Sequence, residues 1–177
     1  LMLMPMLTAV FLSIPAGSLA DRYGVKLVVS IGMVLSAVGG FLRYFMINDF
    51  TVQIVSMFMI GFGIAALNAN LAKVLGSWFK QQTSLAVGVF YAASCVSIVI
   101  AQAFSTYFPT LDVSYLVAAI AEAVTAALWI FFMRNVPEGE PMPEPEPVMK
   151  YIKIAAKSRG VWCIALAYGL TLASTTA

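Results

Sequence analysis

The sequence contains no histidine and very little charge. Ten Lys or Arg and eight Asp or Glu are spread over 177 residues, so charged residues make up 10% of the chain, against about 25% in an average soluble domain. The missing histidine excludes His-ligated zinc sites, Ser-His triads and histidine proton relays. A net charge of +2 gives no basic footprint for nucleic acid. No nucleophile–base pair, metal cluster or phosphate-binding loop is present, so we expect no enzyme, no cofactor and no metal.

Apolar residues dominate the composition. The chain is 62% hydrophobic, against about 45–50% in a soluble domain, and a soluble core of this size cannot cover so much apolar surface. We therefore predict an all-α membrane protein in contact with the lipid bilayer. Cys95 and Cys163 both lie within apolar runs, so we expect two buried small side chains with no redox role and no disulfide.

Long apolar runs set the expected number of helices. A helix needs about 20 mostly apolar residues to cross about 30 Å of hydrocarbon, and the alternation typical of a barrel strand is absent from the sequence. Six runs approach this length and predict a polytopic helical bundle of about six transmembrane helices. They are Leu1–Leu19, Val25–Met46, Val52–Ala72, Ser84–Phe104, Ser114–Met133 and Gly160–Ala177.

Basic residues lie almost entirely on one side of this predicted bundle. If residues 17–26 lie on one side, the other side holds only one base, Arg43. Cytoplasmic loops carry the excess of Lys and Arg, which predicts a multi-pass protein of the cell membrane with the basic side in the cytoplasm. The nine bases on that side are Arg22, Lys26, Lys73, Lys80, Arg134, Lys150, Lys153, Lys157 and Arg159.

The longest break between runs covers residues 134–159. Five prolines and four glutamates are interleaved within residues 137–147, a composition that forms neither a helix nor a core, so we predict an extended cytoplasmic linker. At its end, Lys150, Lys153 and Lys157 follow helical spacing. This pattern indicates a short basic helix against anionic headgroups or an amphipathic leader into the next span, and the two readings are compatible.

A charged segment separates the first two runs. Residues 17–26 read Gly-Ser-Leu-Ala-Asp-Arg-Tyr-Gly-Val-Lys. They resemble the Gly-x-Leu-Ala-Asp-Arg-x-Gly-x-Lys signature between helices two and three of the major facilitator superfamily of secondary transporters. A plain positive-inside loop accounts for the bases alone, whereas the resemblance implies a gating latch that stabilises one face of the transport cycle. Its residues are Gly17, Asp21, Arg22, Gly24 and Lys26.

Local chemistry suggests a task for several of these residues. Gly17 and Gly24 allow close backbone approach and tight turning. Asp21 can accept hydrogen bonds from a neighbouring helix N-terminus or an arginine. Arg22 and Lys26 can bind a lipid phosphate or a cytoplasmic carboxylate.

The resemblance extends along the chain in topology, with the six runs corresponding to family helices two to seven. It divides the chain into residues 1–133, most of the N-terminal six-helix half; residues 134–159, the linker with its basic helix; and residues 160–177, the first helix of the C-terminal half. Helices one and eight to twelve are absent, so we expect a fragment of a longer protein, with the missing helices as partners.

Two motifs of the family's proton-coupled exporters are not found. Residues 57–59, which lie shortly before Gly61-Phe62-Gly63, include no arginine, and residues 91–101 contain neither proline nor glycine. Drug/proton antiport is therefore disfavoured.

Amides in the third run are candidates for binding solute. Asn68 and Asn70 are costly in hydrocarbon unless their polar groups are satisfied. The resemblance places this helix at the central cavity, with Gly61, Ala65, Asn68 and Ala72 on one face, so Asn68 is the candidate solute contact. An interhelical hydrogen bond is the alternative. Lys73 is expected to be an anchor that reaches toward the headgroups.

Two further sites come from other runs. Tyr168, Thr171 and Thr175 follow helical spacing in the last run, which the resemblance places at the cavity. Glu122 is the only acid near the centre of a run. Ion coupling, pairing with a base, and a neutral lipid-facing carboxyl are its possible roles.

Small residues recur every four positions in two runs. Lipid gives helices no hydrophobic drive to associate, so close contact through small side chains must hold them together. We expect both stripes to be packing surfaces: Gly32, Ser36 and Gly40 in the second run, and Ala93, Ser97 and Ala101 in the fourth.

A membrane carrier is the function these features favour. We expect transport of a small polar solute or organic anion by alternating access, either as uniport or coupled to an ion. A non-transporting membrane sensor or receptor on the same scaffold, and an inactive truncated fragment, are the alternatives.

Overall fold

The computed structural model describes residues 4–136, 157–163 and 166–167. The chain divides into two compact units, Leu1–Pro143 and Glu144–Ala177. In the second unit, residues 159–163 and 166–167 are helical, which covers the start of the sixth predicted span. The remainder of that span, with Tyr168, Thr171 and Thr175, and most of the predicted linker lie outside the described residues.

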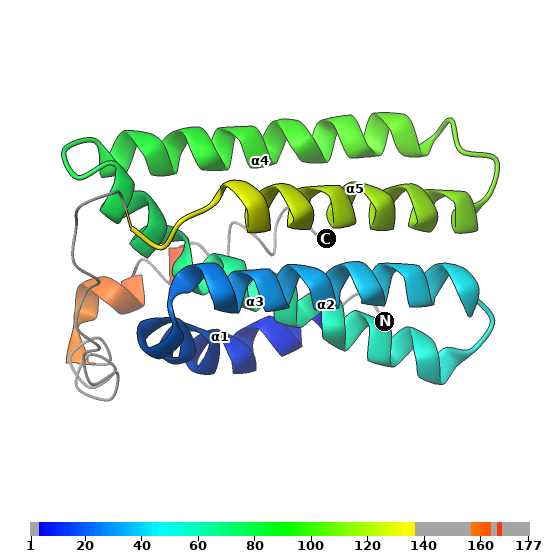
Figure 1. The fold of residues 1–177 in the computed structure, drawn as a ribbon, viewed down its shortest axis with the longest axis horizontal. Helices are drawn as coiled ribbons and strands as arrows, with labels where there is room; N and C mark the ends of the chain where they lie inside the picture. Colours follow the sequence, from blue (N-terminus) through cyan, green and yellow to red (C-terminus); the bar gives the residue numbers. More distant parts are fainter. Residues whose placement is uncertain (1–3, 137–156, 164–165, 168–177) are drawn as a thin grey trace. The chain divides into compact units, whose positions relative to one another are not determined.

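Five helices long and apolar enough to cross a membrane make up the described part of the first unit (Figure 1). This part is all helical, and the prediction of five successive spans before residue 134 is confirmed. The helices are α1 (Met4–Tyr23), α2 (Val25–Phe45), α3 (Phe50–Trp78), α4 (Thr83–Ser105) and α5 (Leu111–Phe132).

Four of the five helices extend beyond the apolar runs that predicted them at one end or both, whereas α2 ends one residue earlier, at Phe45. At 1.5 Å per residue, the 29 residues of α3 span about 43 Å, well beyond about 30 Å of hydrocarbon. The predicted break at residues 76–83 is accordingly shorter, because α3 continues to Trp78 and α4 begins at Thr83. The fall in hydropathy marks the expected edge of the membrane, but the backbone hydrogen bonds of the helix continue beyond it. Lys73 therefore lies inside α3.

Small residues bring α2 into close contact with its neighbours. A Cβ placed on Gly32 would lie 2.8 Å from the Cβ of Ala66, and one on Gly63 would lie 2.8 Å from the Cβ of Ser36. A Cβ on Gly40 would lie 3.0 Å from the Cβ of Ala119 in α5. The first stripe is thus confirmed as a packing surface, with Gly32 and Ser36 against α3 and Gly40 against α5.

The second stripe does not pack as predicted. Ala93, Ser97 and Ala101 are all exposed, and α4 has no buried residue. The partly buried positions of α4 all lie in its first half, between residues 83 and 94. The helix packs against α3. Cys95, expected to be buried, is exposed on this helix, and Cys163 is exposed in the second unit. Apolar surface faces lipid without cost, so an apolar run does not imply burial.

Arg43, the base predicted for the sparsely charged side, makes several contacts of its own. Arg43 donates from Nε to Oε1 of Gln53 at 3.2 Å, and its guanidinium lies 4.0 Å from the centre of the Tyr115 ring. Gln53 in turn donates to the backbone carbonyls of Arg43 and Met46. Asp49 begins α3 by accepting from the amides of Thr51 and Val52. These contacts fix the α2–α3 turn.

Candidate functional site

The segment 17–26, here called the α1–α2 junction, is more helical than expected. Residues 17–23 form the last turns of α1, Gly24 alone links the helices, and Val25 begins α2. Gly24 has a φ of +88°, and it is the only residue with positive φ in the described part of the chain. Gly17 has an ordinary helical backbone, so its predicted role in turning is wrong. A Cβ added there would have room, with its nearest contact 3.9 Å away.

Asp21 pairs with a lysine from α3. Nζ of Lys73 lies 2.6 Å from Oδ1 of Asp21 and also donates to the carbonyl of Gly17 at 3.2 Å. Gly17 and Asp21 are four residues apart, so both face the same neighbour. The two side chains are 26% and 42% exposed, Asp21 being the more covered. Lys73 was predicted as an anchor that reaches toward the cytoplasmic headgroups, and the ion pair corrects that prediction by giving it a partner within the protein.

Gly24 is closely covered by a residue that follows α5. A Cβ on Gly24 would lie 2.8 Å from both Nδ2 and Oδ1 of Asn135. Oδ1 of Asn135 also accepts a 2.7 Å hydrogen bond from the backbone amide of Lys26, 109 residues away in the chain. Asn135 was not among the residues predicted from the sequence. An Asn two residues after the end of the predicted fifth span was its only signal.

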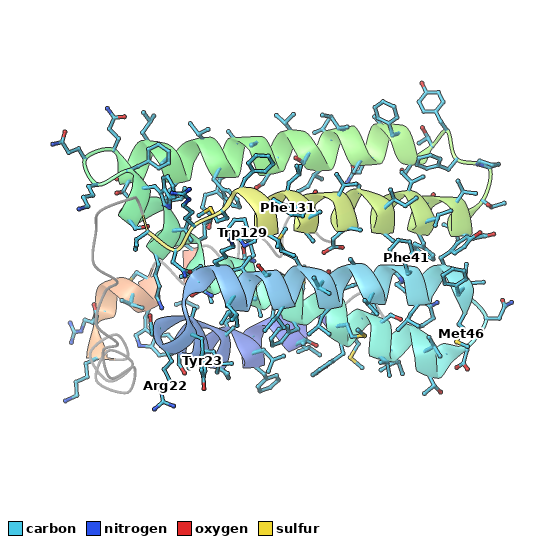
Figure 2. All side chains as sticks on the ribbon, viewed as in Figure 1. Arg22, Tyr23, Phe41, Met46, Trp129 and Phe131 are labelled. Carbon is cyan, nitrogen blue, oxygen red and sulfur yellow. The ribbon has the colours of Figure 1, made fainter. Side chains whose placement is uncertain are left out.

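Arg22 lies on the outside of the junction. Its side chain and that of Tyr23 project away from the bundle in Figure 2, and both residues are exposed. Within the described residues, Arg22 makes no ion pair. The acid of the motif is therefore engaged inside the first unit, while Arg22 is presented outward.

The two amides of α3 have opposite surroundings. Asn68 is exposed and makes no hydrogen bond within the described part of the chain, whereas Asn70 is fully buried and donates from Nδ2 to the carbonyl of Ala66 at 2.8 Å. Gly61 and Ala65 are buried, with Gly61 against Pro5 and Thr8 of α1. The predicted face of Gly61, Ala65, Asn68 and Ala72 is thus part packing surface and part exposed edge.

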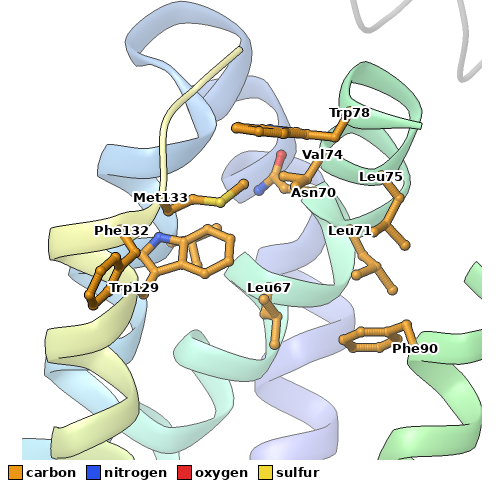
Figure 3. A pocket seen from close by; sticks show the side chains of 11 residues that line it. Leu67, Asn70, Leu71, Val74, Leu75, Trp78, Phe90, Trp129, Phe132 and Met133 are labelled. Carbon is orange, nitrogen blue, oxygen red and sulfur yellow. The ribbon is translucent and has the colours of Figure 1, made fainter. Parts of the chain in front are cut away.

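Asn70 opens onto an apolar cavity of about 420 Å³ between α2, α3, α4 and α5 (Figure 3). Asn70 lies between Trp78 and Met133, with the Trp129 indole on the α5 side. Oδ1 of Asn70 and Nε1 of Trp129 are buried without a hydrogen-bond partner in the described residues. This cavity was not predicted from the sequence, because apart from Asn70 its walls are ordinary apolar residues of four helices.

Glu122 lies on the side of α5 that faces the bundle. It is partly buried, and Ala119 and Ala126, one turn to either side, are the buried residues of the helix. Within the described residues it forms no ion pair. No cluster of three or more potential metal ligands occurs in the described part of the chain either.

Comparison with known families draws these observations together. The family model described as Major Facilitator Superfamily matches residues 1–177. The chain belongs to the Major Facilitator Superfamily. It is therefore a multi-pass integral membrane protein and a membrane transporter, in a family whose members are transporters rather than enzymes. Searches of curated proteins and of solved structures returned no match.

Proposed function

We propose that this superfamily chain belongs to an alternating-access carrier for a small polar solute or organic anion, in which the α1–α2 junction is a gating latch on the cytoplasmic side. In this proposal residues 1–133 are most of the N-terminal half, residues 134–159 are the cytoplasmic linker, and residues 160–177 begin the C-terminal half. The carrier lies in the cell membrane.

The arrangement of Asp21 and Arg22 carries the proposal. A plain positive-inside loop needs only exposed bases. Here Asp21 is held by Lys73 at 2.6 Å, and Gly24 is fixed against Asn135. A defined backbone thus presents Arg22 outward, where a carboxylate or a lipid phosphate can bind it. In the latch, Arg22 and Lys26 engage the opposing half when the cytoplasmic side is closed.

Asn68 is the proposed solute contact. Its exposure and the absence of a hydrogen bond to a described residue support this role over the packing alternative. An amide offers a carbonyl acceptor and two donors, which suit hydroxyl, carboxylate and amino groups. Tyr168, Thr171 and Thr175 stay candidates for the opposite wall of the cavity, and Glu122 stays the candidate for ion coupling.

Uptake into proteoliposomes that contain the full-length protein tests the proposal. A panel of carboxylates, sugars and nitrate is offered with and without gradients of protons or sodium. Asn68→Ala raises the apparent KM for uptake of the transported compound. The matched control is Ser94→Ala, because the Ser94 hydroxyl donates within its own helix. No uptake of any compound, or equal constants for both variants, would contradict the proposal.

A further inference from the structure

The first turn of α2 lacks a cap of its own. Its N-cap residue is Gly24, which has no side chain to accept from the free amides at the helix start. Gly24 is nonetheless buried. A buried helix start needs an acceptor from elsewhere, because an unpaired backbone amide is costly away from water.

Asn135 supplies that acceptor. Its Oδ1 lies 2.7 Å from the amide nitrogen of Lys26, the second residue of α2. Asn is among the best N-cap side chains, and here it acts from 109 residues away rather than from the adjoining turn. The Asn135 carboxamide occupies the space above Gly24, with its Nδ2, Oδ1 and Cγ at 2.8, 2.8 and 3.0 Å from where a Cβ would lie.

Gly24 therefore meets two requirements at once. Its φ of +88° is one that side-chain-bearing residues rarely adopt, and its missing Cβ leaves room for the Asn135 amide. A glycine needed only for the turn would have to adopt the positive φ, but it would not need the free space above it. The Asn135 carboxamide could not occupy this position if residue 24 had a Cβ.

The hydrogen bond from Lys26 to Asn135 connects the α1–α2 junction to the segment that follows α5. The last residue of α5 is Phe132, so Asn135 lies just beyond the helix and two residues before Pro137, in the segment predicted to begin the linker. We propose that Asn135 is a positioning residue for the latch. Its carboxamide holds the α1–α2 junction in the conformation that places Asp21 at Lys73 and Arg22 on the outside. Displacement of residues 134–136 releases that conformation. This inference rests on the proposed latch.

Hydrogen exchange at Lys26 in the full-length protein tests the contact without reference to transport. Asn135→Leu keeps the approximate size but removes the acceptor, so exchange of the Lys26 amide speeds up by roughly three- to tenfold. Asn135→Asp keeps an acceptor at a helix N-terminus and keeps the slow exchange. Unchanged exchange in Asn135→Leu would overturn the proposal.

Uptake by the same variants tests the positioning role. Asn135→Leu lowers the uptake rate, and Asn135→Asp restores most of it. If Asp21→Asn impairs uptake and Asn135→Leu does not, the latch stands and Asn135 is only a helix cap. If neither variant changes uptake, the latch itself is refuted and the positioning role with it.

Discussion

Replacing Gly24 by alanine perturbs the junction in a way whose cost can be worked out. At a φ of +88°, an L-residue costs about 1–2 kcal/mol more than glycine. The new Cβ would also lie 2.8 Å from the Asn135 amide, which is a movable side-chain end and therefore shifts. The shift breaks the hydrogen bond to Lys26, which contributes about 1 kcal/mol. Gly24→Ala should lower the free energy of unfolding by about 2–3 kcal/mol.

A double-mutant cycle separates the two terms. In an Asn135→Ala background the amide is already gone, so Gly24→Ala costs only the backbone term of about 1–2 kcal/mol. The coupling between the two sites is then about 1 kcal/mol. Equilibrium unfolding of the purified protein in mixed micelles with SDS measures all four variants. Gly17→Ala is the matched control, because a Cβ has room there. A neutral Gly24→Ala, or full additivity with Asn135→Ala, would refute the reasoning.

Three further predictions concern other contacts, and the same unfolding assay measures their stability effects. Lys73→Met lowers the unfolding free energy by less than about 1 kcal/mol, because the lysine is 42% exposed. The same variant reduces uptake at least tenfold. A variant that does not fold would contradict this prediction. Arg43→Met costs about 1–2 kcal/mol through the Tyr115 and Gln53 contacts, and Arg43→Lys recovers part of the loss, whereas equal stability of all three proteins would contradict it. The unfolding free energy of Asn70→Leu stays within about 1 kcal/mol of the parent value, because the change removes an unpaired buried oxygen together with one hydrogen bond. A loss above about 3 kcal/mol would show that the amide has a partner.

The five spans before residue 134 and their order followed from the sequence, because lipid imposes a length requirement on every helix. The Gly32–Ser36 stripe was predictable for a similar reason, since only small residues permit close approach. The helix ends were not predictable from apolar runs. Met4–Tyr23 and Phe50–Trp78 both continue into the polar region, where hydropathy falls but helical hydrogen bonding does not.

The partners of the junction could not be read from the sequence. Asp21 and Lys73 are 52 residues apart, and Lys26 and Asn135 are 109 apart. Nothing local specifies either pair, because each depends on how α1, α2, α3 and α5 pack. The sequence does place Asn68 and Asn70 about 200° apart around a helix. Only the neighbouring helices decide which of the two is buried.

The central claim is that the α1–α2 junction gates a carrier, and the initial rate of solute uptake by Asp21→Asn tests it most directly. Asp49→Asn is the matched control, because it removes the same charge at the opposite end of the bundle and Asn still caps α3. Asp21→Asn should reduce the rate at least tenfold with normal membrane insertion, and Asp49→Asn should leave it unchanged. Equal rates for the two variants and the parent protein would contradict the claim.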